Sequence, residues 1–147
     1  MTKHKMIAAA LLIAGAAVFL RPAYADNSEV AVKGRAAIQA LDDLNAVTHV
    51  VSYVDYMRRV ADTKVIVERF VRVAPDNANA SDLGKARFLI EIAMADHALA
   101  LTYWRQALDS QTFKEREETL KLVEEAWEKA KRFTDEARGH VPLPDAT

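Results

Sequence analysis

The chain has 147 residues, a formal charge of −1 at pH 7, no cysteine, four glycines and four prolines. This length suits a single domain with its own core. The absence of cysteine excludes disulfide bonds and a covalently attached c-type haem, and the charge balance argues against the strongly basic surface of a nucleic-acid-binding protein.

Residues 1–25 have the three parts of a secretory signal peptide. Two lysines provide the positive start, residues 6–20 form an apolar run, and residues 23–25 (Ala-Tyr-Ala) match the small-x-small cleavage site. The alternative is an uncleaved membrane anchor, but fifteen helical residues cover only about 22 Å of a hydrocarbon core about 30 Å thick. We therefore expect cleavage, no stable membrane anchor after it, and one helical domain over residues 26–147.

The expected destination is the periplasm, with secretion from the cell as the alternative. Loss of the signal peptide would leave 17 of the 20 basic residues against 21 acidic residues, a net charge of −4. No basic stripe remains on such a chain, so we expect neither nucleic acid nor an anionic membrane as the main partner. Without disulfides, packing alone must stabilise the exported domain.

Sparse glycine and proline residues predict an all-α domain. Neither residue type interrupts residues 35–74 or residues 85–138, whereas a sheet needs turns far more often. Residues 75–81 form the one clear loop. The two prolines of the tail, residues 138–147, predict an extended and loose end.

Two helices are predicted in the second half of the chain. Asn79 or Ser81 can cap the first of them, near residues 82–109. A Thr-x-x-Glu capping box that starts at Thr112 opens the second, near residues 112–138. Apolar residues recur every three or four positions in both segments, as expected for helices that bury one face.

The stretch before the loop is harder to interpret. Valines within residues 47–73 alternate in part as in a strand, but no second strand pattern exists to pair with them, so we expect helix. Residues 29–74 contain no strong helix breaker, and we favour one long or kinked helix over a bend near residues 42–48. The predicted fold is therefore a three- or four-helix up-and-down bundle with a long N-terminal helix.

A long N-terminal helix would overhang its neighbours. Its first third would then expose five apolar residues, namely Val30, Ala37, Ile38, Leu41 and Leu44. Either this segment folds back onto the bundle, or a second copy covers it. We favour a homodimer through residues 29–46.

The sequence carries no recognisable catalytic or metal-binding motif. No Asp or Glu in residues 26–147 is followed three positions later by His, which excludes the Glu-x-x-His pairs of ferritin-like di-iron bundles. Ser52, His49 and Asn45 lie on one helical ridge and have the types of a nucleophile, a base and an orienting group. A serine in the middle of a helix has no free amide donors beside it, however. We expect a polar seam there, and no enzyme.

His97 has the most unusual position, because it interrupts an otherwise apolar helical stripe. Hairpin geometry places Met57, Met94 and Trp127 near its level. A His/Met layer of this kind could hold haem or a copper ion. The plainer interpretation is a core histidine, with Met and Trp as packing residues and no cofactor.

Two functions therefore remain open. We favour a non-enzymatic helical module of the cell envelope, interacting with or accessory to a protein partner or a second copy. The alternative is a small haem- or copper-binding periplasmic carrier that uses His97, Met57 and Met94.

Overall fold

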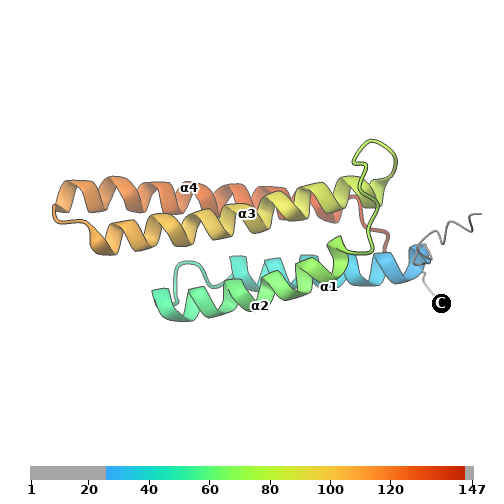
Figure 1. Cartoon of the computed structure of the whole chain (residues 1–147), viewed down its shortest axis with the longest axis horizontal. Coiled ribbons are helices and arrows are strands. Elements are labelled where there is room, and N and C mark those ends of the chain that lie inside the picture. Colours follow the sequence, from blue (N-terminus) through green and yellow to red (C-terminus); the bar gives the residue numbers. More distant parts are fainter. Residues whose placement is uncertain (1–25, 145–147) are drawn as a thin grey trace, which may run out of the picture.

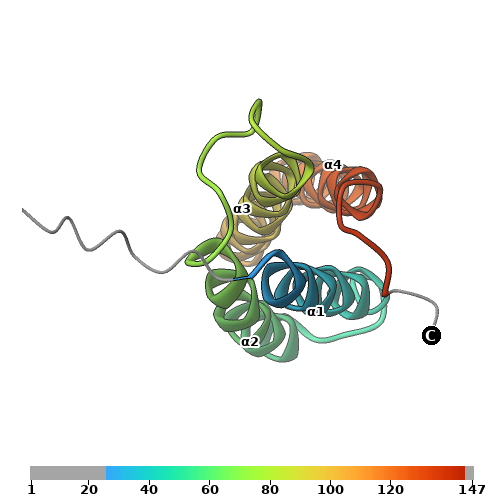
Figure 2. The same cartoon turned by 90° about the vertical axis from the view of Figure 1, so that its right-hand side faces the viewer.

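The computed structural model describes residues 26–144 and contains four helices: α1 (Asn27–Asn45), α2 (Tyr53–Val71), α3 (Asp82–Asp109) and α4 (Phe113–Arg138). No strand occurs in this part of the chain, so the all-α prediction is confirmed. The α1–α2 hairpin forms one layer of an up-and-down bundle and the α3–α4 hairpin forms the other (Figures 1 and 2). The predicted signal peptide lies outside the described residues.

The prediction of a long N-terminal helix is wrong, because two helices replace it. α1 ends at Asn45, residues 46–52 form a linker, and α2 begins at Tyr53. Ser52 has an extended backbone, and its hydroxyl accepts a hydrogen bond from the amide of Asp55 at 3.2 Å. Ser52 is therefore the N-cap of α2 and not a mid-helix residue, and this cap allows the chain to restart without glycine or proline.

The N-terminal segment folds back and buries its own apolar face. All five residues that a long helix would have exposed are buried, namely Val30, Ala37, Ile38, Leu41 and Leu44. Phe70 and Val141 approach so closely that a side chain at Gly34 would have to push them aside. Of the two outcomes expected for residues 29–46, the structure has the fold-back, which removes the reason for a homodimer through this segment.

The predicted boundaries of the two later helices are confirmed. The Ser81 hydroxyl accepts from the amide of Gly84 at 3.0 Å and caps α3. The Thr112 hydroxyl accepts from the amide of Glu115 at 3.2 Å and caps α4. Beyond α4, the tail contacts the bundle, because Val141 is buried.

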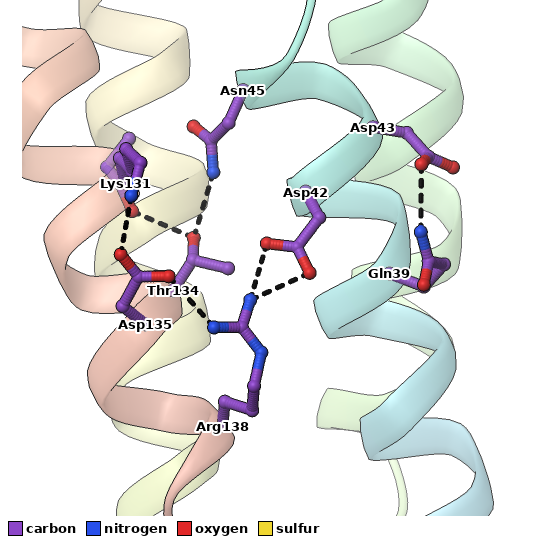
Figure 3. A network of polar contacts seen from close by, with 9 residues as sticks. Gln39, Asp42, Asp43, Asn45, Lys131, Thr134, Asp135 and Arg138 are labelled. Atoms are coloured by element: carbon purple, nitrogen blue, oxygen red, sulfur yellow. Dashed lines mark hydrogen bonds and ion pairs between the residues drawn. The ribbon is translucent and has the colours of Figure 1, made fainter.

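Polar contacts fix α1 beside α4 (Figure 3). Arg138 donates to the two carboxylate oxygens of Asp42 at 2.6 and 2.7 Å, and to Asp135 at 2.9 Å. Nearer the end of α1, the Asn45 side chain donates to the Thr134 hydroxyl at 3.5 Å. These contacts set the level along α4 at which α1 stops.

The two hairpins differ in length. α1 and α2 have 19 residues each, whereas α3 has 28 and α4 has 26. At about 1.5 Å per residue, the α3–α4 hairpin is longer by roughly 10–13 Å. Figure 1 shows its turn extending beyond the linker between α1 and α2. The overhang thus lies at the α3–α4 turn and not at the N-terminal segment. None of the described helices has the length and hydropathy needed to cross a membrane.

Candidate functional site

An aromatic cluster occupies the bundle where the linker meets α3 and α4. The ring centroids of Tyr56, Trp104 and Trp127 lie 5.5–5.7 Å from one another. Tyr53 lies 5.7 Å from Trp104, and the His49 ring is 5.2 Å from Trp127. Most of these pairs are edge-to-face, the geometry in which aromatic rings attract beyond simple burial. The cluster therefore joins α2, α3, α4 and the linker.

A hydrogen-bond chain crosses the bundle through this cluster. Trp127 of α4 donates its indole N–H to the Tyr56 hydroxyl at 2.9 Å, and that hydroxyl lies 2.7 Å from Nδ1 of His97 on α3. Figure 2 shows that α2 and α4 occupy opposite corners, so Tyr56 links helices that are not neighbours. Because the indole can only donate, both bonds are satisfied when Tyr56 donates to Nδ1. His97 then carries its proton on Nε2, which is buried and has no partner among the described residues.

Burial determines the charge of this chain. It lowers the pKa of His97 from 6.5 to about 4, and it raises the pKa of Tyr56. Both side chains are therefore neutral at pH 7. Neither is exposed at all, so a substrate in solution cannot contact them. This geometry suits a structural network better than acid–base catalysis.

The structure brings together only part of the predicted His/Met layer. Met94 is buried on α3 near His97 in sequence, but Met57 is 46% exposed. Tyr56, one residue earlier, points inward instead and takes the place beside His97. The sequence offered a signal for this: Tyr56 shares the i, i+4, i+7 stripe of α2 with Val60 and Thr63.

The three residues of the suspected catalytic ridge do not meet. Ser52 donates to the carboxylate of Asp55 at 2.9 Å as part of the α2 cap. His49 packs on Trp127, and Asn45 bonds to α4. Across residues 26–144, no group of three or more His, Asp or Glu side chains is placed to hold a metal ion.

A pocket of about 250 Å³ opens directly beside the aromatic cluster. The linker, α3 and α4 each form one wall of it. Its lining is mostly aromatic and aliphatic with one carboxylate, and comprises Thr48, His49, Val51, Trp104, Leu120, Val123, Glu124 and Trp127. The pocket exists because the α1–α2 hairpin stops here while the α3–α4 hairpin continues.

Beyond the pocket, the core-facing stripes of α3 and α4 continue without cover. On α4, Phe113, Leu120 and Trp127 are seven residues apart and share one face. On α3, Leu108 follows Trp104 by four positions. Leu108 is 56% exposed, Phe113 80% and Leu120 39%. We call the surface formed by Trp104, Leu108, Phe113 and Leu120 the apolar shelf.

Comparisons of the chain with family models, with curated proteins and with solved structures found no match. The site must therefore be interpreted from its own geometry. That geometry combines a buried neutral network, an aromatic pocket and an uncovered apolar surface at one end of the bundle.

Proposed function

We propose that the mature chain is an exported, non-enzymatic interaction module of the cell envelope that binds a protein partner at the apolar shelf. The periplasm is the proposed location, with secretion as the alternative. The observation that carries this proposal is the uncovered continuation of the bundle core past the end of the α1–α2 hairpin.

The shelf has the properties of a docking surface. Leu108, Phe113 and Leu120 belong to the same stripes that are buried elsewhere in the bundle, and they adjoin a pocket with aromatic walls. Contiguous apolar surface next to a pocket is typical of protein-binding sites, in which one buried anchor supplies much of the affinity. Helical segments with an apolar stripe would complete the bundle section that α1 and α2 leave open.

The surroundings of the pocket give little support to catalysis. Its one hydroxyl, that of Thr48, donates to the carbonyl of Asn45 at 3.1 Å. His49 and Glu124 both line the pocket, but no hydrogen bond joins them in the described structure. A nucleophile, a base and an orienting group in contact are therefore missing from this part of the chain.

The carrier alternative rests on one observation, the unpartnered and buried Nε2 of His97. With the proton on Nδ1 instead, Nε2 has the free lone pair of an iron or copper ligand. The exposed Met57 weakens the alternative, because its sulfur is not held against His97. Titration of the purified protein with haem and with Cu(I) tests it, since a Soret band or a stoichiometric copper complex that His97→Leu abolishes would favour the carrier.

Site-specific photo-crosslinking in cells that export the chain tests the interaction proposal. A photoreactive amino acid at Leu108 should give a discrete adduct. The same amino acid at Phe88 is the control, because Phe88 is 53% exposed on the opposite face of the same helix. Leu120→Asp should abolish the adduct at position 108. Equal adducts at both positions, or none at position 108, would contradict the proposal.

A further inference from the structure

We propose that the partner at the apolar shelf is a second copy of this chain, packed antiparallel so that each α3–α4 turn lies on the shelf of the other copy. The inference rests on the proposed function and names the occupant of that surface. It differs from the dimer expected from the sequence, which used residues 29–46 and not the overhanging end.

The shape of the overhang favours an identical partner. At this end α3 and α4 continue as a two-helix layer beyond α1 and α2 (Figure 1). Leu108, Phe113 and Leu120 give this layer an exposed apolar face, and a second two-helix layer of the same length would complete the bundle section. A two-fold axis perpendicular to the helices supplies that half, because it places α4 antiparallel on α4 and α3 antiparallel on α3. The two tips then form a four-helix section with a closed core.

Charge fixes the register of this pairing. Arg116 and Glu117 lie between Phe113 and Leu120, and helical periodicity puts both on the shelf side of α4. Within one chain Arg116 donates to the Ser110 carbonyl at 3.3 Å and Glu117 lies 3.4 Å from Lys121, exposed contacts that pairing across the interface would replace. With the axis midway between Arg116 and Glu117, each Arg116 faces Glu117 of the second copy. A shift of the axis onto either residue would instead place two like charges together. The favoured register also sets Phe113 opposite Leu120 of the second copy, and the symmetry repeats both pairs.

The same register gives the pocket its occupant. Leu120 lines the pocket, so the phenyl ring of Phe113 from the second copy lies at the pocket mouth. Phe113 is the first residue of α4, directly after the Thr112 cap, and 80% of it is exposed. The Thr112 cap fixes the backbone at Phe113 before binding, which reduces the entropy lost on association. Because few side chains contribute, we expect a reversible dimer at the small end of interface sizes.

Sedimentation velocity of the exported, processed chain tests this proposal over roughly 1 µM to 1 mM. The wild-type mass should rise from monomer to dimer across this range. Phe113→Asp should remain monomeric, whereas Phe88→Asp, the matched control on α3, should dimerise as the wild type does. Arg116→Glu and Glu117→Arg should each weaken dimerisation about tenfold, and the double variant should restore it, because the exchange re-forms both cross-pairs.

Each contrary result has a distinct meaning. A wild-type chain that stays monomeric throughout would overturn the second copy as partner, while an adduct with another protein at position 108 would leave the proposed function standing. A dimer unaffected by Phe113→Asp would place the interface elsewhere and overturn the inference. A double charge variant that fails to recover would overturn the register.

Discussion

Replacing Tyr56 by phenylalanine would remove one oxygen atom from the centre of the bundle. The Tyr56 hydroxyl accepts from Trp127 at 2.9 Å and lies 2.7 Å from Nδ1 of His97. Tyr56 and His97 are fully buried, and Trp127 is nearly so. The variant keeps the ring and its packing, so its effect isolates the hydrogen bonds.

The expected loss follows from the two groups left behind. In Tyr56→Phe, the Trp127 indole N–H and the His97 Nδ1 both remain buried without a partner. Each such group costs about 1–3 kcal/mol. We therefore expect the free energy of unfolding to fall by about 2–6 kcal/mol, a large share of the roughly 5–15 kcal/mol of a typical domain. At roughly 4 °C per kcal/mol for a domain of this size, the melting temperature should fall by about 8–24 °C.

Urea unfolding followed by far-UV circular dichroism measures this loss directly. Tyr53→Phe is the matched control, because Tyr53 belongs to the same aromatic cluster and its hydroxyl has no hydrogen bond in the described structure. The control should stay within about 0.5 kcal/mol of the wild type. If Tyr56→Phe also lost less than about 1 kcal/mol, the hydrogen-bond chain would be refuted as a stabilising element.

A double-mutant cycle with His97→Leu separates the two bonds of the chain. His97→Leu alone removes the unpartnered Nε2 but leaves the Tyr56 hydroxyl without an acceptor, so the two effects should nearly cancel. The double variant should be less destabilised than the sum of the single variants, by about 1 kcal/mol or more. Simple additivity would mean that Tyr56 and His97 do not interact.

Three further predictions concern pH, the start of α3, and processing. Folding lowers the pKa of His97 from 6.5 to about 4, so as the pH falls the unfolded chain takes up a proton at His97 before the folded chain does. The free energy of unfolding should therefore be constant above pH 6.5 and should fall by up to about 3 kcal/mol between pH 6.5 and about pH 4. Thermal melts at a series of acid pH values should show that His97→Leu lacks this loss of stability. Burial raises the pKa of Asp96, which changes stability in the opposite direction, but it does so equally in the variant and the wild type. Gly84→Ala should cost about 1–3 kcal/mol in urea unfolding, since its methyl group would collide with the Asn77 carbonyl and displace the loop. N-terminal sequencing of the exported chain should begin at Asp26, and a start at the initiating methionine would exclude cleavage.

The N-terminal starts of α3 and α4 could be predicted from the sequence because local hydrogen bonds determine them. Ser81 and Thr112 cap these helices through their own side chains, and no distant contact is needed. The linker between α1 and α2 escaped prediction because it lacks glycine and proline. Its signal was the Ser-x-x-Asp pattern at Ser52, a cap that sequence analysis interpreted as part of a polar seam. An N-cap that no glycine or proline precedes is a weak indication of a helix break. The packing of α1 against the rest of the bundle determined that the chain breaks there.

The buried network could be predicted only in part, for a geometric reason. His97 was identified because it interrupts an apolar stripe, which is a local property of α3. Its partner was misplaced by one residue, Met57 for Tyr56, because counting from the α2–α3 turn gives the level of a residue along the bundle but not the face on which its side chain lies. One residue on a helix rotates a side chain by about 100°, which exchanges a buried position for an exposed one. Pairing across helices therefore requires the buried face of each helix as well as the level.

The network and the shelf are linked through the register of the bundle. The Tyr56 hydroxyl contacts Trp127 of α4 and His97 of α3 at hydrogen-bond distance, so both contacts form in only one alignment of α2 with α3 and α4. A slip of α2 by one turn, about 5.4 Å, would separate the Tyr56 hydroxyl from both partners and leave buried polar groups unpaired. Such a slip would move the linker along α4 and would either cover the pocket or widen it. The buried polar chain positions α2, and the contacts of Asp42 and Asn45 with α4 position α1, so together they determine where the α1–α2 hairpin stops and where the apolar shelf begins.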